Sequence, residues 1–332
     1  MMKMESQNTP TQKVLTVKDL HTFFYTKKGV VKAVDGVSFT VEKKEIVGLV
    51  GESGCGKSIT SLSIMRLVPQ PAGRIVSGEI IFQGEDLQKK TDEQMRSIRG
   101  DRLSMILQDP MVALNQLLTV GYQIGEVLKY HSKGNGSFRE KCIHLLEKVK
   151  VPSPERRIDD YPFQFSGGMC QRVLISIGIA NNPDLLIADE PTTALDVTIR
   201  AQILNLMREI QQESNTAIIL ITHDLATVAQ ICTRVLVMYA GRIVEQAPVK
   251  IFYKNPSHPY TVGLIRSVPV LGRRIDRLYS LGGSPPNLLH PPPGCRFAPR
   301  CSKAMPVCHE QYPPEVTIAD NHQVSCWLYI KD

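Results

Sequence analysis

One eight-residue stretch limits the fold of this chain more than any other feature: Gly51-Glu-Ser-Gly-Cys-Gly-Lys-Ser58. It fits the pattern G-x-x-x-x-G-K-[ST]. The apolar run Glu45–Val50 before it is typical of a buried strand, and Ile59–Leu67 after it has apolar residues near helical spacing. A strand, a glycine-rich turn and a helix form the setting in which this pattern binds phosphate. The sequence therefore predicts an α/β fold built around a phosphate-binding loop.

The residue types in this loop suit a nucleoside triphosphate with Mg²⁺. Glycines let the backbone bend so that several N–H groups point at one phosphate, and the following helix adds its positive end. Lys57 can reach the β- and γ-phosphates, and the Ser58 hydroxyl can bind Mg²⁺. The nucleotide-binding residues predicted here are Gly51, Ser53, Gly54, Cys55, Gly56, Lys57, Ser58 and Ile59.

Composition excludes several classes of protein. The length of 332 residues suits one large domain or two modest ones, and 42% hydrophobic residues are enough for a real core. The net charge of +7 is small for this length, which favours a solvated basic surface over a nucleic-acid-binding one. The sequence has no run of about 18 apolar residues and no apolar signal core in Met1–Gln12, so we expect a cytosolic protein. There, the eight cysteines are expected to be metal ligands or buried thiols rather than disulfides.

Four polar residues come at the ends of three further predicted strands: Gln108, Asp189, Glu190 and His223. Because parallel strands end at one edge of a sheet, these side chains are expected near the phosphate loop. Asp189 is placed to hold Mg²⁺ through water, and Glu190 to polarise an attacking water. His223 is expected to contact the γ-phosphate, and Gln108 to point into the same site.

Three aromatic residues precede the loop: Phe23, Phe24 and Tyr25. One of these rings can stack on a purine base. For each of them, a place in the core of the first strands is an equally good interpretation. We take Phe24 as the candidate for the adenine contact.

Ser166, Gly167 and Gly168 begin another predicted helix, Met169–Ala180. Ser166 is a good N-cap, and the glycines would expose N–H groups at a positive helix end, which makes a second anion site. On these residues alone, an ordinary capped helix is the better interpretation.

The rest of the chain divides into three predicted parts. An antiparallel start covers Val14–Phe24 and Val30–Val41. Two amphipathic helices, Leu117–Tyr130 and Phe138–Val149, form an insertion before Ser166. From Ala247 onward prolines cluster, and we expect a tail with little regular structure.

Six motifs resemble, in order, those of an ABC-transporter ATPase. They are Gly51–Ser58, Gln108, Phe165–Met169, Leu185–Glu190, Ala194–Asp196 and His223, similar to the Walker A, Q-loop, signature, Walker B, D-loop and H-loop. The resemblance implies an ABC nucleotide-binding domain of the P-loop NTPase fold over residues 14–250. It would have an antiparallel β subdomain, a RecA-like core and a helical subdomain at about residues 110–165. The resemblance also implies that Lys57, Ser58, Gln108 and Asp189 bind ATP and Mg²⁺.

In that family two such domains pair head to tail. ATP lies between the phosphate loop of one domain and the signature of the other. The resemblance therefore implies that Ser166, Gly167 and Gly168 complete the site of a partner, and it adds Asp196 of the D-loop to the nucleotide-site residues. Catalysis in such a site is mostly positioning and electrostatics.

The sequence after residue 250 narrows the resemblance to the dipeptide/oligopeptide importer ATPases of the peptide/nickel branch. The stretches that carry it are Asn255–Thr261, Gly283–Leu288 and Pro293–Cys301, with Gln108–Met111 and Leu114–Asn115 earlier in the chain. It implies an ATPase that powers uptake of di- or oligopeptides, with nickel or another solute as alternative cargo. The implied partners are a second ATPase in a heterodimer, two membrane permeases and, indirectly, an extracytoplasmic solute-binding protein. No nucleic acid is expected, and the protein would lie on the cytoplasmic face of the inner membrane.

Three residues depart from the pattern of that branch. Phe165 stands where leucine is usual, Cys170 where arginine is usual and Gln116 where proline is usual. None of these changes removes a phosphate-binding or catalytic group, so we expect an active half-site. Phe165 is expected to alter the packing of the signature helix and so the rate.

Four of the cysteines lie in the tail: Cys295, Cys301, Cys308 and Cys326, with five, six and seventeen residues between them. The two Cys-x₂-Cys pairs of a zinc ribbon are missing, and chemistry alone leaves an iron–sulfur cluster, zinc and reduced thiols all open. The resemblance favours a [4Fe–4S] cluster with a structural or regulatory role, in an irregular domain over residues 251–332. His309 and His322 are expected to be solvated rather than ligands, and the other four cysteines to be ordinary small side chains.

Two rival functions belong to other classes. A soluble ABC ATPase of translation or DNA repair would resemble proteins with two nucleotide domains or a long coiled-coil insertion, and this chain has neither feature. An iron–sulfur redox enzyme would need a flavin, NAD or substrate site, and the sequence shows no such pattern.

Overall fold

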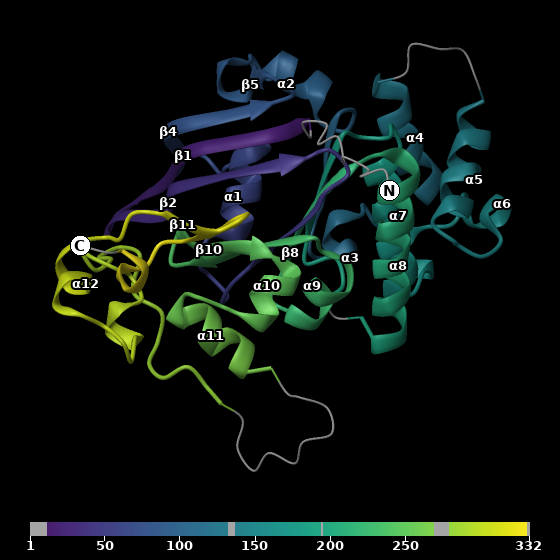
Figure 1. The fold of residues 1–332 in the computed structure, drawn as a ribbon. Coiled ribbons are helices and arrows are strands. Elements are labelled where there is room, and N and C mark those ends of the chain that lie inside the picture. The colour runs from purple at the N-terminus through teal and green to yellow at the C-terminus, as the bar shows by residue number, and fades with distance from the viewer. Residues whose placement is uncertain (1–11, 132–136, 194, 269–278, 331–332) are drawn as a thin grey trace, which may run out of the picture.

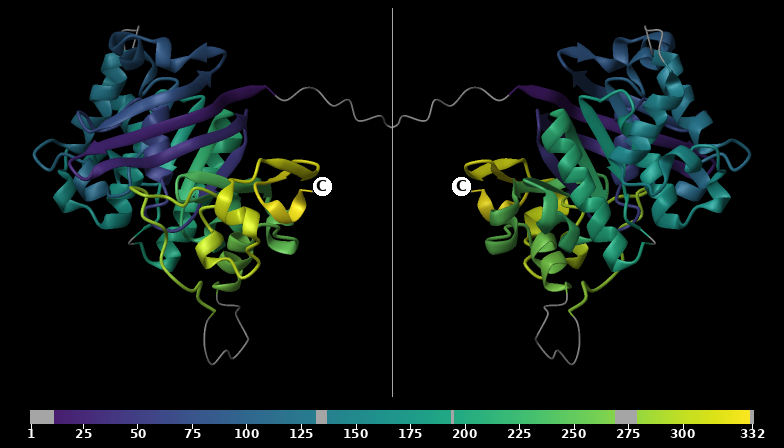
Figure 2. Two further views of the ribbon diagram at one scale, coloured as in Figure 1. Left: turned by 90° about the vertical axis from the view of Figure 1, so that its left-hand side faces the viewer. Right: turned by 90° about the vertical axis from the view of Figure 1, so that its right-hand side faces the viewer.

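The computed structural model describes residues 12–131, 137–193, 195–268 and 279–330. Ala194, the first residue of the predicted D-loop motif, lies outside the described residues. Within them the chain forms two β-sheets, and helices pack against the larger one (Figures 1 and 2).

The smaller sheet is antiparallel, in the order β2–β1–β4–β5. Its strands are β1 (Lys13–Thr26), β2 (Gly29–Glu42), β4 (Gly73–Phe82) and β5 (Glu85–Asp86). Alternate apolar residues of β1 and β2, such as Leu15, Val17 and Val37, are buried on one face. The predicted antiparallel start is therefore confirmed.

The larger sheet has the order β11–β12–β10–β9–β3–β8–β7–β6. Its parallel part runs from β9 to the edge strand β6 and consists of β3 (Ile46–Val50), β6 (Leu103–Ile106), β7 (Leu185–Asp189), β8 (Ala217–Thr222) and β9 (Arg234–Tyr239). β10 (Arg242–Pro248) is antiparallel to β9. The central strands are continuous apolar runs because both faces of a parallel sheet are covered.

The two faces of the larger sheet belong to two different hydrophobic clusters. In β3, Val47 and Leu49 pack with the smaller sheet, whereas Ile46 and Val50 pack with the helices on the other side. This alternation follows from the two-residue period of a strand. The end of β3, and the phosphate loop that follows it, therefore lie between the smaller sheet and the helices.

The helices begin and end close to the predicted bounds. Around the sheets lie α1 (Lys57–Ile64), α2 (Asp92–Ile98), α7 (Gly167–Ile179), α8 (Val197–Ser214) and α9 (Leu225–Ile231). The insertion holds α3 (Pro110–Ala113), α4 (Val120–His131), α5 (Phe138–Lys148) and α6 (Pro154–Arg157). The last three stand to one side in Figure 1. Both amphipathic helices predicted there are confirmed as α4 and α5.

The expectation of a tail with little regular structure holds for residues 279–297, which form no helix or strand, but it is wrong for the residues on either side. The region after Ala247 contains α10 (Val249–Lys254), α11 (Pro259–Arg266), α12 (Pro306–Glu310), β11 (Val316–Ala319) and β12 (His322–Val324). β12 pairs with β10, so the end of the chain adds two strands to the larger sheet. The proline clusters do not exclude helices here, because Pro259 and Pro306 occupy the first position of α11 and α12. At that position the N–H group that proline lacks would have no partner within the helix.

The expectation that His322 is solvated is also wrong. His322 is 3% exposed, and its Nε2 donates to Glu245 Oε1 at 2.8 Å. Glu245, on β10, is itself buried, which explains why the histidine must be buried with it. His309 is exposed, as expected.

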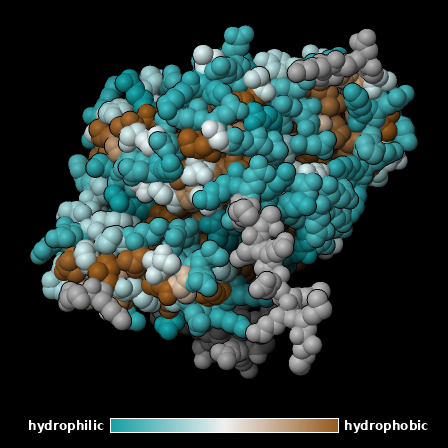
Figure 3. All heavy atoms as spheres, turned by 45° about the horizontal axis from the view of Figure 1, so that its top comes forward, coloured by the Kyte–Doolittle hydropathy of each residue, from teal (hydrophilic) through white to brown (hydrophobic). Residues whose placement is uncertain are grey.

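The described residues include no helix that is both long enough and apolar enough to cross a bilayer. On the face shown in Figure 3, hydrophobic residues form separate patches among hydrophilic ones.

Candidate functional site

The phosphate loop joins β3 to α1, and two of its glycines are required by close backbone contacts. A Cβ on Gly51 would lie 2.1 Å from the carbonyl oxygen of Met238, and one on Gly56 would lie 2.3 Å from that of Ala33. Both residues have positive φ angles, 156° and 110°. The loop is therefore pressed against β2 and β9, while Ser53, Gly54 and Ser58 stay exposed.

Lys57 is buried beneath this loop, and its ammonium group is turned onto the loop's own carbonyls. Nζ donates to Gly51 O at 2.8 Å and to Glu52 O at 3.0 Å. These carbonyls satisfy the buried charge. A phosphate in the loop would offer the same ammonium a charged acceptor, which makes a stronger hydrogen bond.

Asp189, the last residue of β7, fits the role of a Mg²⁺ ligand. It is 5% exposed, and its buried Oδ1 has no hydrogen-bond partner within the described residues. Burial raises the pKa of Asp189, the Glu190 charge adds to this shift, and the Ser58 hydroxyl opposes it. A buried carboxylate oxygen without a donor is costly unless a cation binds it. Ser58 and Asp189 therefore supply oxygen ligands of the kind that Mg²⁺ prefers.

Glu190 follows directly and is held by three donors. Its carboxylate accepts hydrogen bonds from Gln108 Nε2 at 3.0 Å, Thr193 Oγ1 at 2.8 Å and His223 Nδ1 at 3.0 Å. Burial raises the pKa of Glu190, but the hydrogen bonds from His223 and Thr193 outweigh it, and the pKa lies below its usual value. The carboxylate is therefore ionised at neutral pH and able to accept a hydrogen bond from water.

The structure thus brings together three of the predicted strand-end residues, Gln108, Glu190 and His223. They meet because β6, β7 and β8 are neighbours in the sheet. Gln108 lies against Glu190 here, and its predicted role as a Mg²⁺ ligand stays a prediction. Sequence reasoning missed Thr193, although a hydroxyl three residues after a strand-end carboxylate is the signal that could have found it.

The N-terminus of α7 is exposed. Ser166 caps the helix by accepting from Met169 N at 3.4 Å, and nothing lies within 4 Å of a Cβ built on Gly167. Among the described residues, no hydrogen bond joins Ser166, Gly167 or Gly168 to the phosphate loop. Asp196 caps α8 by accepting from Ile199 N at 2.9 Å, and Ile199 in turn lies against Gly168. These two helix ends therefore form one surface.

Two of the unusual residues near this helix belong to the core. Phe165 is 7% exposed, with the Arg157 guanidinium 5.5 Å from the ring centroid. Cys170 is fully buried, and its thiol donates to Pro162 O at 3.4 Å. Gln116 is held by hydrogen bonds from its Nε2 to the carbonyls of Met111 and Leu114.

The aromatic candidates differ in exposure. Phe23 and Phe24 are half-buried on β1, whereas Tyr25 is 47% exposed and the Arg74 guanidinium lies 5.7 Å from its ring centroid. The contact between Phe24 and adenine stays a prediction, because no contact in the structure separates the three rings for that role.

The four tail cysteines line one small cavity, together with His258, Phe297 and Trp327. Burial raises the pKa of Cys295 and Cys301, and raises that of Cys326 to about 11, with the other three sulfurs adding to the last shift. No group of three or more His, Cys, Asp or Glu side chains in the described ranges is arranged so that it could hold a metal ion. The sulfurs converge without forming a single-ion site.

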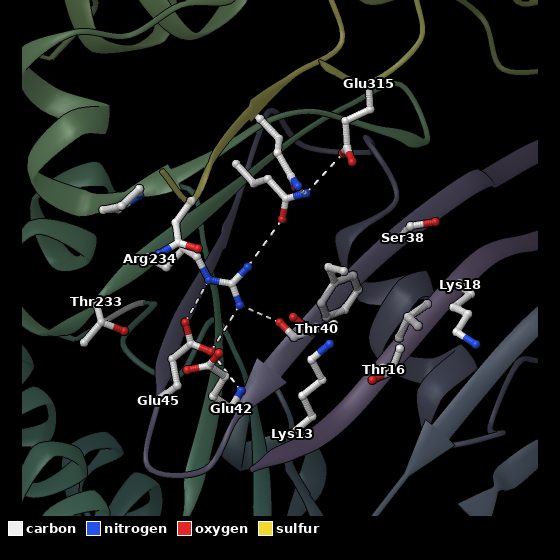
Figure 4. Close-up of a pocket in the computed structure, with 16 residues that line it drawn as sticks. Lys13, Thr16, Lys18, Ser38, Thr40, Glu42, Glu45, Thr233, Arg234 and Glu315 are labelled. Carbon is white, nitrogen blue, oxygen red and sulfur yellow. Dashed lines mark hydrogen bonds and ion pairs between the residues drawn. The ribbon is translucent and has the colours of Figure 1, made fainter. Parts of the chain in front are cut away.

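A larger hollow of about 530 Å³ lies between the smaller sheet and the end of the chain (Figure 4). Its charges are largely satisfied within the wall. Arg234 forms two hydrogen bonds to Glu45, at 2.8 and 3.1 Å, and Gln246 donates to Glu315 at 3.1 Å. The hollow contains none of the predicted site residues, and its wall acts to join the two sheets.

Two family models match the chain. Residues 34–193 match the one described as ABC transporter, and residues 244–308 match the one described as oligopeptide/dipeptide transporter, C-terminal region. The first match includes the phosphate loop, and the second includes Cys295, Cys301 and Cys308 but ends before Cys326.

Curated relatives are similar over nearly the whole length. The chain is 51% identical over 318 residues to the dipeptide transport ATP-binding protein DppD of Bacillus subtilis, covering 96% of this chain and 95% of that protein. It is 48% identical over 322 residues to the oligopeptide transport ATP-binding protein OppD of the same organism, covering 96% and 90%. Among solved structures, the dimeric MJ0796, a bacterial ABC transporter cassette, is 25% identical with a TM-score of 0.64. That match covers 71% of this chain and 98% of the cassette.

Proposed function

This chain belongs to the ATP-binding proteins of ABC transporters, in the branch with the oligopeptide/dipeptide transporter C-terminal region, and we propose that it is the ATP-hydrolysing subunit of a peptide importer. The observation that carries the substrate class is that similarity to dipeptide and oligopeptide transport proteins extends through the tail as well as the nucleotide-binding part. The cargo is therefore di- or oligopeptides.

The phosphate loop and the strand ends divide the chemistry between them. Lys57 leaves the carbonyls of Gly51 and Glu52 to bind the β- and γ-phosphates of ATP, beside the backbone N–H groups of the loop. Ser58 and Asp189 hold Mg²⁺, which neutralises charge on the phosphates. Glu190 orients the water that attacks the γ-phosphorus, and ADP leaves as the bond to the bridging oxygen breaks. His223 holds the Glu190 carboxylate and faces the γ-phosphate.

A second ATPase completes the site. The exposed end of α7, with Ser166, Gly167 and Gly168, supplies N–H groups to the nucleotide bound by the partner's loop, and Asp196 lies at the same interface. The exposure of this helix end and the dimeric state of the related cassette support this arrangement. We expect the partner to be a different chain, which makes the pair a heterodimer.

Two membrane permeases dock beside Gln108. The segment that follows this residue exposes apolar side chains on α3, on α4 and in the connection between them, namely Met111 (44%), Val112 (82%), Leu117 (85%) and Tyr122 (54%). Docking there places the protein on the cytoplasmic face of the membrane. An extracytoplasmic solute-binding protein delivers the peptide to the permeases.

The four tail thiols hold a [4Fe–4S] cluster in this proposal. The support is their convergence on one cavity that has no carboxylate lining. A four-iron cluster uses one thiolate for each iron, whereas zinc draws all its ligands onto a single ion. Iron, sulfide and zinc analysis of protein made in iron-replete, anaerobic conditions tests it. Stoichiometric zinc in a colourless protein would exclude the cluster.

The function is tested by reconstituting the complex in vesicles with its permeases and binding protein. Labelled di- and oligopeptides should enter in an ATP-dependent way, and the Glu190→Gln variant should not support uptake. Uptake of nickel but not of peptides would show that nickel is the cargo. Full ATPase activity without permeases, together with no co-purifying permease, would favour a soluble ATPase instead.

A further inference from the structure

Glu52, inside the phosphate loop, is held by residues from the far end of the chain. Its carboxylate forms a two-pronged ion pair with Arg300, with Nη1 to Oε2 at 2.8 Å and Nη2 to Oε1 at 3.1 Å. Its backbone N–H donates to the Tyr260 hydroxyl at 2.9 Å. The Arg300 side chain is 6% exposed and that of Glu52 is 24% exposed, so water screens this pair weakly.

The same residue connects to Lys57. The Glu52 carbonyl accepts the hydrogen bond from Lys57 Nζ, so one residue contacts the phosphate-binding lysine and the C-terminal region at once. Without Arg300, the Glu52 carboxylate would be an unpaired negative charge beside the place where a triphosphate binds. Two negative charges in a partly buried site repel each other more strongly than in water. Arg300 therefore both neutralises the loop and fixes its shape.

Arg300 and Tyr260 both lead to the four-thiol cavity. Arg300 immediately precedes Cys301, which lines that cavity. Tyr260 follows His258, another cavity residue, and its N–H donates to His258 Nδ1 at 3.0 Å. Phe297 also lines the cavity, and its ring centroid lies 5.5 Å from that of Tyr260. A continuous set of packed side chains thus runs from the thiols to Glu52.

We propose that Arg300 and Tyr260 are positioning residues that couple the four-thiol cavity to the nucleotide site through Glu52. A change in what the thiols bind changes the placement of these two residues and, through them, the ATP affinity of the loop. By linkage, nucleotide binding changes the affinity of the thiols for their occupant by the same factor. The coupling rests on the proposed binding of ATP and on the proposed [4Fe–4S] cluster as the occupant of the thiols.

The direct test is the affinity of the full-length protein for a fluorescent ATP analogue. Arg300→Ala is expected to weaken binding by roughly tenfold, because it leaves Glu52 charged and unpaired. Arg300→Lys should recover part of the loss. The double variant Glu52→Gln with Arg300→Ala should recover most of it, since the repelling charge is gone. A loss of stability from the unpaired Glu52 charge would also be relieved in the double variant, so the stability of each variant is measured beside its affinity.

The matched control for the ion pair is Arg234→Ala. Arg234 also makes two hydrogen bonds to one glutamate, Glu45, but it lies in the wall of the large hollow rather than at the phosphate loop. Its loss should lower stability and leave nucleotide affinity unchanged. Thermal unfolding without nucleotide separates loss of fold from loss of binding in every variant.

The cavity side is tested with Cys301→Ser and Cys326→Ser, and the buried Cys142→Ser in the helical insertion is the control. The first two should weaken nucleotide binding severalfold, and this effect should disappear when Arg300 is already alanine and Tyr260 is already phenylalanine. Unchanged affinity in Arg300→Ala, or a thiol effect that persists without both Arg300 and the Tyr260 hydroxyl, overturns the coupling. If the wild-type protein binds no ATP, the proposed function fails instead.

Discussion

Gln108 Nε2 donates to Glu190 Oε2 at 3.0 Å, across the ends of two neighbouring parallel strands. Thr193 donates to the same oxygen, whereas Oε1 accepts from His223. A carboxylate has about four acceptor positions, so Oε1 can also accept a hydrogen bond from the attacking water. Gln108 is the donor that stands directly before the exposed segment of α3, so a movement of that segment would remove one of the two donors to Oε2.

The first prediction concerns this carboxylate. Glu190→Gln keeps the size of the side chain but removes the charge that polarises water. We expect hydrolysis by the assembled complex to fall by about 10²–10⁴-fold, while ATP affinity stays close to that of the wild type. Phosphate release and nucleotide binding measure the two effects. Glu209→Gln, an exposed residue of α8 paired with Lys150, is the control. Normal hydrolysis with Glu190→Gln in both ATPase subunits would refute the assignment.

The second prediction concerns Asp189 and pH. Burial raises the pKa of Asp189 in the folded protein above the usual 3.8, because it disfavours the charged form relative to the unfolded chain. Its favourable contribution to stability is present below pH 3.8 and is lost as pH rises through the folded-state value. The Asp189→Asn variant has no carboxyl group to ionise, so its stability does not fall in this way as pH rises. The nucleotide-free variant should therefore gain in melting temperature over the wild type as pH rises from 3.8 toward neutral.

Once Mg²⁺ and ATP are added, the wild type should have a higher melting temperature than the Asp189→Asn variant. The wild type gains stability from the bound ligand, whereas the variant has lost a metal ligand and gains less. Thermal unfolding across pH, with and without MgATP, measures both effects. A variant that is stabilised by MgATP as strongly as the wild type would show that Asp189 does not bind the metal.

The third prediction compares two adjacent glycines. A Cβ on Gly168 would lie 2.7 Å from Ile199 Cγ2, whereas none of the described atoms lies within 4 Å of a Cβ on Gly167. Gly168→Ala should therefore cost about 1–3 kcal/mol of stability, and Gly167→Ala should cost little. Urea unfolding of the isolated chain gives the difference, and each variant is the control for the other. Equal midpoints would mean that the end of α7 and Ile199 are not packed together in solution.

The parts of the site that sequence reasoning predicted are those fixed by local pattern. Short apolar runs lead into the phosphate loop, into Asp189 and Glu190, and into His223. Such a run is the main sequence signature of a buried parallel strand, so the polar residues at its end can be placed at the edge of the sheet. The order of β6, β7 and β8 then brings Gln108, Glu190 and His223 together.

What sequence reasoning missed depends on contacts between distant residues. Arg300 and Glu52 are 248 residues apart, and no periodicity links them. His322 was expected in water because its partner, Glu245, is 77 residues away on another strand. The residues next to a polar or ionisable side chain in the sequence do not show whether it is buried. Burial is possible only where a hydrogen-bonding partner is available in the fold, and that partner can be far away in the sequence.

The last prediction tests how the end of the chain is held. Glu245 is 1% exposed and accepts from Ser257 N at 2.9 Å, His258 N at 2.8 Å and His322 Nε2 at 2.8 Å. Glu245→Gln leaves one oxygen and places an amide N–H group against a donor. We expect a loss of about 1–3 kcal/mol for each donor left without an acceptor.

Because these donors come from β12 and from the approach to α11, the C-terminal region should come loose before the nucleotide-binding core unfolds. Limited proteolysis should cut the Glu245→Gln variant after residue 255 at urea concentrations that leave the wild type intact. Glu310→Gln, on the exposed side of α12, serves as the control. If the two variants are cut alike, Glu245 does not hold the tail.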